Sequence, residues 1–242
     1  MIRWRRYKDI WCLWPAKPIG LIELIGGSYL ATNPQIAYKR LLESLCQKDI
    51  AVHAWGYFPN FDHQAQANQA WKDFRECRKH LESRVSTLPI SLRIGHSLGC
   101  KLHLLSPDGG RNSRALIAIS FNNFNANKSI PMLKKVSSRL GFSTEFSPSP
   151  QKTLNLISKH YLQPKNLLIT FEGDNLDQTP TLLKCLKDRA HDSTSMINLK
   201  GGHLTPASAG VRESIFGKSI HSSTKDQAIK QLIKLISNLS CS

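Results

Sequence analysis

Short apolar runs alternate along this chain with longer stretches in which apolar residues recur every three or four positions. The short runs are typical of buried strands, and the longer stretches have the spacing of amphipathic helices. Strands are predicted at residues 20–27, 50–57, 91–96, 115–121, 166–171 and 195–202, and helices at 34–48, 64–85, 98–105, 152–161 and 224–240. This order predicts an α/β fold with a mostly parallel central sheet and helices on both faces.

Residues 122–161 interrupt the alternation. They contain a predicted helix at 130–141, a Ser/Pro-rich stretch and a second predicted helix. We therefore expect a partly helical, lid-like insertion above the sheet. Its apolar residues would either cover an acyl chain or pack on the body of the protein.

The chain has 242 residues, of which 40% are hydrophobic. This length and composition suit a single domain spanning residues 1–242. Arginines interrupt the apolar N-terminus, and no run approaches the ~20 apolar residues of a membrane-spanning helix, so we expect a soluble, cytoplasmic protein. The six cysteines lie far apart and form no CxxC pair. Free thiols are therefore expected, rather than a zinc site or a disulfide framework.

The formal charge of +16 creates a field that attracts anions. The basic residues are spread over several predicted helices, which favours a solvated basic surface or a loosely held anionic partner over nucleic-acid binding. The N-terminal segment mixes arginines with Trp4, Trp11 and Trp14. It could contact an anionic membrane or an acidic partner peripherally, or form an edge strand or hairpin.

A serine lies between two glycines at the end of a predicted strand, where residues 95–99 read GHSLG. The pattern GxSxG between a strand and a helix is typical of a nucleophile elbow, a sharp turn that leaves the serine exposed. Ser97 is therefore the predicted nucleophile. The alternative is a tight strand-to-helix turn in which Ser97 only caps the helix.

A serine nucleophile needs a base, a group that orients the base, and donors for the oxyanion. His203 follows the last predicted strand and a pair of glycines, so it is the predicted base. Asp174 stands just past the strand at 166–171 and is the predicted acid. Asp177 is the alternative acid, and one of the two carboxylates is expected to cap the helix that follows. The order serine, acid, histidine is that of α/β-hydrolase triads.

The oxyanion would accept hydrogen bonds from two backbone N–H groups. One belongs to Leu98, directly after the serine. The other belongs to Gly27 or Ser28, in a glycine loop where small residues let the backbone approach a ligand. This loop has neither the GxxxxGK nor the GxGxxG pattern of phosphate-binding loops. No metal or organic cofactor is expected, because serine catalysis needs neither.

Four segments, IGGSYLATNPQIAYKRLLESL, NFDH, GHSLGCKLHLL and FEGDNLDQTP, resemble an uncharacterised family of α/β-hydrolase-like proteins from photosynthetic organisms. The resemblance implies an α/β-hydrolase fold and no particular reaction. Within it, Ser97 matches the elbow serine and Asp174 falls in the acidic loop. Glu23 departs from the family, where a histidine is expected. His63 belongs to the NFDH signature and would either line the mouth of the site or lie in the first turn of a helix capped by Asp62.

Together these features favour a serine hydrolase that acts on the acyl esters or thioesters of a small molecule. The same residues would serve an acyltransferase if the insertion at 122–161 excluded water and admitted another acceptor. The alternative from a different class is a non-catalytic binding or assembly protein. Such a protein would keep the hydrolase scaffold and contact a membrane surface or an acidic partner.

Overall fold

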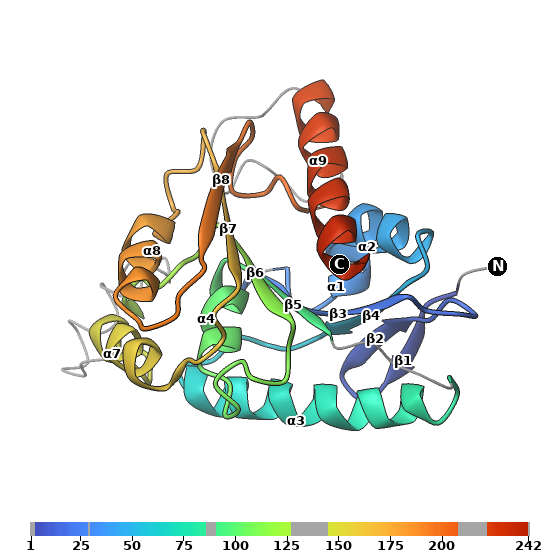
Figure 1. The fold of residues 1–242 in the computed structure, drawn as a ribbon, viewed down its shortest axis with the longest axis horizontal. Coiled ribbons are helices and arrows are strands. Elements are labelled where there is room, and N and C mark those ends of the chain that lie inside the picture. Colours follow the sequence, from blue (N-terminus) through green and yellow to red (C-terminus); the bar gives the residue numbers. More distant parts are fainter. Residues whose placement is uncertain (1–2, 29, 86–90, 127–144, 208–221, 242) are drawn as a thin grey trace, which may run out of the picture.

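The structure is a computed structural model that describes residues 3–28, 30–85, 91–126, 145–207 and 222–241. Its central sheet has eight strands in the order β1-β2-β4-β3-β5-β6-β7-β8 (Figure 1). The pairs from β4 to β8 are all parallel, whereas β2 joins β4, and β1 joins β2, in antiparallel fashion. The predicted α/β class with a mostly parallel sheet is thus confirmed.

The parallel strands coincide with the apolar runs of the sequence. Their bounds are β3 Gly20–Ile25, β4 Ile50–Trp55, β5 Leu92–His96, β6 Ala115–Ile119, β7 Asn166–Phe171 and β8 Ser195–Leu199. The strands β3 to β6 are buried along their whole length, as their near-continuous apolar sequences require. The N-terminal segment forms a hairpin of β1 (Arg5–Tyr7) and β2 (Ile10–Leu13), one of the alternatives expected for it.

The described part of the chain contains seven helices. They are α1 Pro34–Ala37, α2 Lys39–Cys46, α3 His63–Glu82, α4 Leu98–Leu104, α7 Pro150–His160, α8 Thr179–Lys187 and α9 Ser222–Cys241. The helix predicted at 34–48 is divided in two at Tyr38, where φ is −113° and ψ is 17°. The buried Tyr38 side chain reaches back to the glycine loop. This contact joins two different elements, so apolar spacing along the chain does not encode the break.

Helices enclose the sheet on both faces. The helices α1, α2 and α9 pack on one face, and α3, α4, α7 and α8 pack on the other. Figure 1 shows α9 and α3 on opposite sides of the strands. In α9, Ile229, Leu232 and Ile236 are buried. The apolar stripe of this helix therefore faces the core, as its spacing predicts.

The insertion predicted at 122–161 is described only in part, because 127–144, with the helix expected at 130–141, lie outside the described residues. Its last element, α7, packs on α8 and buries Ile157. This portion packs on the body of the protein, and the lid itself stays a prediction. In the part of the chain that the structure describes, no helix has the length and apolar character needed to cross a membrane.

Candidate active site

Ser97 lies in a strained turn between β5 and α4. Its backbone has φ 55° and ψ −121°, a region that residues other than glycine rarely adopt. The flanking glycines allow this turn. A Cβ on Gly95 would lie 2.5 Å from the Cα of Cys100, and a Cβ on Gly99 would lie 2.0 Å from the carbonyl oxygen of Ile25. The GxSxG pattern therefore forms a sharp strand-to-helix turn with Ser97 at its tip.

Three side chains from distant parts of the sequence form a hydrogen-bonded row. His203 Nε2 lies 3.1 Å from Ser97 Oγ, and His203 Nδ1 lies 2.9 Å from Asp174 Oδ2. A carboxylate only accepts hydrogen bonds, so we assign the ring proton to Nδ1, which leaves Nε2 to accept from the serine hydroxyl. Burial, the largest single influence, raises the pKa of Asp174, but the hydrogen bond and charge of His203 and the hydrogen bond from the N–H of Leu176 act together with others to lower it. The ionised carboxylate thus holds the imidazole in the orientation of a base.

Two neighbouring loops hold the acid and the base at the carboxyl end of the sheet. The N–H of Gly173, after β7, donates to the carbonyl of Gly201, after β8, at 2.9 Å. Gly201 has φ 148°, which glycine tolerates best. Asp174 Oδ1 accepts from the N–H of Leu176 at 2.9 Å. These bonds fix the direction in which the Asp174 carboxylate faces His203.

Asp177, the alternative acid, takes another role. Its Oδ1 accepts from the N–H of Thr179, the first residue of α8, at 2.8 Å. Burial raises the pKa of its carboxyl. Of the two carboxylates, the structure brings Asp174 to His203 and places Asp177 at the helix start, where the sequence expects one of them.

Two backbone N–H groups beside the serine lack a hydrogen-bond partner among the described residues: those of Leu98 and Ser28. Leu98 is the first residue of α4, and the first N–H groups of a helix have no partner within it. The N–H of Gly27 instead donates to Tyr38 Oη at 2.9 Å. This bond makes Gly27 unavailable to a substrate, so of the two expected donors in the glycine loop we carry Ser28 forward. A Cβ on Gly27 would lie 3.1 Å from the Cβ of Ser97, so the loop borders the serine directly.

A chain of buried hydrogen bonds behind the serine joins the glycine loop to the histidine loop. His96 Nε2 lies 2.9 Å from the carbonyl oxygen of His203, so this nitrogen must donate. His96 Nδ1 then accepts from Tyr38 Oη at 2.7 Å, and Tyr38 Oη accepts from the N–H of Gly27. Burial, followed by the proximity of His203, lowers the pKa of His96 to about 3. The neutral imidazole completes the chain with every donor matched to an acceptor.

Sequence reasoning did not assign a role to His96 or Tyr38. His96 occupies the variable position before the serine of GxSxG, and Tyr38 lies inside a predicted helix. The signal that was available is the polar histidine at the end of a predicted buried strand. Its partners are set by the fold, so the sequence alone could not name them.

A cavity of about 410 Å³ opens beside Leu98 and Ser28, within the size range of small-molecule sites. His63 lines this cavity. Asp62 caps α3, since its Oδ1 accepts from the N–H of Ala65 at 2.9 Å. Both readings of the NFDH segment are therefore correct: Asp62 caps the helix, and His63 lines the cavity from its first turn.

Glu23, the departure from the resembled family, lies away from the glycine loop. It is buried in the middle of β3, and its Oε1 accepts from Arg78 Nη2 at 2.6 Å. Arg93 Nε lies 3.8 Å from its other carboxylate oxygen. A buried carboxylate needs such cationic partners. Glu23 therefore belongs to a structural ion network, and the strand ends on Ile25 before the glycines begin.

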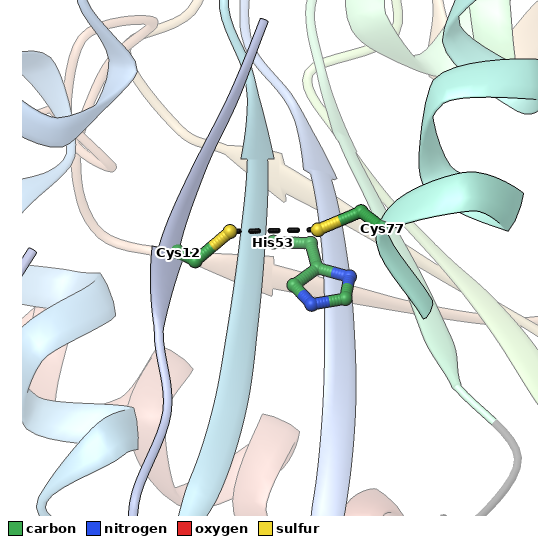
Figure 2. A group of neighbouring side chains, drawn as sticks. All are labelled: Cys12, His53 and Cys77. Carbon is green, nitrogen blue, oxygen red and sulfur yellow. Dashed lines mark hydrogen bonds between the residues drawn. The ribbon is translucent and has the colours of Figure 1, made fainter. Parts of the chain in front are cut away.

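One group of side chains among the described residues, Cys12, His53 and Cys77, has donor atoms within 4.8 Å of one another. Figure 2 shows the thiols of Cys12 and Cys77 pointing toward each other, at a sulfur separation of 3.5 Å, with the His53 ring beside Cys77. The indole N–H of Trp14 donates to His53 Nε2 at 3.0 Å. The ring proton must then lie on Nδ1, so neither nitrogen has a free lone pair for a metal. We assign a buried thiol pair here.

The thiol pair agrees with the expectation of unlinked cysteines. The hydrogen bond with Cys12, together with burial, raises the pKa of the Cys77 thiol. The cysteines with described side chains are all free: Cys12, Cys46, Cys77, Cys100 and Cys185. Four of these are buried, so they act as packing residues.

The profile of a family described as "Protein of unknown function (DUF1350)" matches residues 3–238. The chain belongs to this family. No curated protein matches the sequence.

Solved structures with the same fold are α/β-hydrolases of several kinds. The Francisella virulence factor BioJ is similar at a TM-score of 0.67 and 15% identity, over 98% of this chain and 84% of that chain. The Staphylococcus aureus fluorophosphonate-binding serine hydrolase FphF is similar at a TM-score of 0.62 and 15% identity, over 98% of each chain. Carboxyl esterase 2 from Tuber melanosporum is similar at a TM-score of 0.63 and 14% identity, over 96% and 82% of the two chains. At these identities the likeness establishes the α/β-hydrolase fold.

Proposed function

We propose that this protein is a serine hydrolase of acyl esters or thioesters. The observation that carries the proposal is the row from Ser97 through His203 to Asp174, with contacts of 3.1 and 2.9 Å. The strained backbone at Ser97 adds support, because strain of this kind clusters at functional sites. The hydrolase folds of the similar structures agree with this class of reaction.

In the first half of the reaction, Ser97 Oγ attacks the acyl carbonyl carbon while His203 Nε2 takes the hydroxyl proton. Asp174 stabilises the imidazolium that forms. The N–H groups of Leu98 and Ser28 donate to the oxyanion, and the loss of one such donor typically slows acyl transfer about 10²- to 10³-fold. The intermediate then breaks its bond to the alkoxide or thiolate, which leaves with the proton from Nε2.

In the second half, a water molecule attacks the acyl-serine while His203 accepts a proton from it. Breakdown of this intermediate releases the carboxylic acid and returns the proton to Ser97 Oγ. An alcohol or amine in place of water would give acyl transfer. Product analysis in the presence of an added acceptor distinguishes the two outcomes.

The proposal is tested by labelling the purified protein with a fluorophosphonate and locating the adduct by mass spectrometry. We expect a single adduct on Ser97 in the wild type, none in Ser97→Ala, and strongly slowed labelling in His203→Ala. Asp177→Asn is the matched control for the acidic loop and should still label. If the folded wild type stays unlabelled by both a bulky and a small fluorophosphonate, the proposal is wrong and the non-catalytic binding scaffold takes its place.

A further inference from the structure

A lysine side chain lines the cavity beside the candidate oxyanion donors, although the walls of such cavities are formed mostly by apolar side chains. Lys101 lies in α4 and is only 1% exposed. Its Nζ donates to the carbonyl of Pro148 at 3.0 Å, and the Phe146 ring lies 5.9 Å away. An ammonium group has three N–H donors. Two of the three thus have no hydrogen-bond acceptor among the described residues.

The Lys101 ammonium also lacks a counter-ion. Among the described residues, no carboxylate oxygen lies within 4.0 Å of Lys101 Nζ. Glu145 is the acidic group whose charge acts on Lys101. However, Glu145 Oε1 accepts from the N–H groups of Ala126 and Phe146 at 3.1 and 2.7 Å. A buried charge without a partner is costly, so a ligand that supplies a negative charge would be favoured here.

Two further polar atoms on the cavity wall lack partners. His63 Nδ1 and Asn123 Oδ1 are both buried and have no hydrogen bond in the described structure. Burial, together with the charge of Lys101, lowers the pKa of His63 to about 3, so its ring is neutral and offers one donor. Buried polar groups are almost always paired in folded proteins. Lys101 and His63 offer donors that an acceptor on a ligand would satisfy, whereas Asn123 Oδ1 is an acceptor and needs a donor.

We propose that this cavity binds the carboxylate of an acyl group that carries a second, distal acid, and that Lys101 is the residue that recognises it. The substrate class is therefore the half-ester or half-thioester of a dicarboxylic acid. The inference rests on the proposed hydrolase function, because Ser97 would cleave the ester at the other end.

The geometry of the cavity fits such a ligand. Lys101 lines the same cavity as Leu98 and Ser28, so its amine and the two candidate oxyanion donors border one space. Phe58, Phe124 and Phe146 line the same cavity and offer apolar surface to methylene groups. Burial lowers the pKa of Lys101 to about 8, so most of the amine is charged at pH 7. A bound carboxylate would raise this pKa again, because an opposite charge favours the ammonium form.

The test compares kcat/KM for two N-acetylcysteamine thioesters of equal chain length, glutaryl and pentanoyl. We expect wild type to prefer the glutaryl thioester by about 10- to 100-fold in kcat/KM. This factor corresponds to the free energy of one hydrogen bond to a charged group. Lys101→Met should bring the ratio close to one, and Lys101→Arg should restore part of it. Lys184→Met, an exposed lysine of α8, is the matched control and should leave the ratio unchanged.

A binding measurement separates this inference from the proposed function. Calorimetric titration of glutarate into wild type, Lys101→Met and Lys184→Met needs no turnover. If Ser97 is not reactive but glutarate binding depends on Lys101, the hydrolase proposal fails and the carboxylate site stands. If Ser97 reacts but wild type shows a ratio near one and binds no glutarate, the carboxylate site is overturned, and Lys101 only anchors Pro148. The wild-type ratio decides the matter even if Lys101→Met does not fold.

Discussion

Replacing Tyr38 with phenylalanine removes one oxygen from the hydrogen-bond chain behind the serine and keeps the ring. The N–H of Gly27 then loses its acceptor at 2.9 Å, and His96 Nδ1 loses its donor at 2.7 Å. Both atoms belong to buried residues, and each unsatisfied buried group costs about 1–3 kcal/mol. We therefore expect Tyr38→Phe to lower the free energy of unfolding by about 2–6 kcal/mol. For a chain of this length, each kcal/mol lowers the Tm by roughly 2–4 °C.

Urea denaturation followed by fluorescence measures this loss, and Tyr161→Phe is the matched control. Tyr161 is buried and its hydroxyl donates to Asn166 Oδ1 at 2.8 Å, on the side of α7 and β7. The control should lose stability and keep the wild-type rate of fluorophosphonate labelling. Tyr38→Phe should also slow labelling, because the glycine loop and the His203 carbonyl lose their common anchor. A loss below about 1 kcal/mol for Tyr38→Phe, or equal labelling rates in both variants, would refute the role of the chain.

The two carboxylates of the acidic loop should differ in their effects on activity and on stability. Asp174→Asn should lower kcat by about 10⁴-fold, by analogy with the triad acid of serine proteases. Asp177→Asn should mainly lower the free energy of unfolding by about 1 kcal/mol, because the start of a helix loses a hydrogen bond. Acid should destabilise the protein through Asp108, whose pKa is lowered, against the effect of burial, by its hydrogen bonds from Arg93. The folded pKa lies below the unfolded value of about 3.9, so this contribution is full above pH ~4 and is lost as pH falls through the folded pKa. Asp108→Asn should flatten the decline in urea midpoint below pH ~4. In a Cys241→Ser background, half-buried Cys185 should react first with a thiol reagent, and the buried cysteines should react only on unfolding. Fast modification of a buried thiol in the native state would contradict the packing described.

The central strands β3 to β6 were predictable because most of their residues are apolar on both faces. Burial by helices on both faces leaves little room for polar residues in β3 to β6, so each strand stands out in the sequence. The site residues were predictable for a related reason. In a parallel sheet, residues just after the strands gather at one edge, so Ser97, Asp174 and His203 could be placed together before their contacts were known.

The remaining features depend on contacts between distant segments. The break at Tyr38, the two hydrogen bonds of His96 and the burial of Lys101 all arise from tertiary packing. Lys101 in particular reads as a solvated charge on a helix, since lysine is almost never fully buried. The choice of Ser28 over Gly27 likewise rests on a hydrogen bond to Tyr38 that no local pattern announces.

The most direct measurement is the pre-steady-state reaction of the protein with an excess of p-nitrophenyl acetate, with the intact mass recorded during the burst. We expect about one equivalent of nitrophenolate in the burst and an acetyl group on Ser97 that hydrolyses with turnover, with no burst in Ser97→Ala. Acetylation of the Lys101 amine instead, or turnover that persists unchanged in Ser97→Ala, would contradict the assignment of Ser97 as the nucleophile.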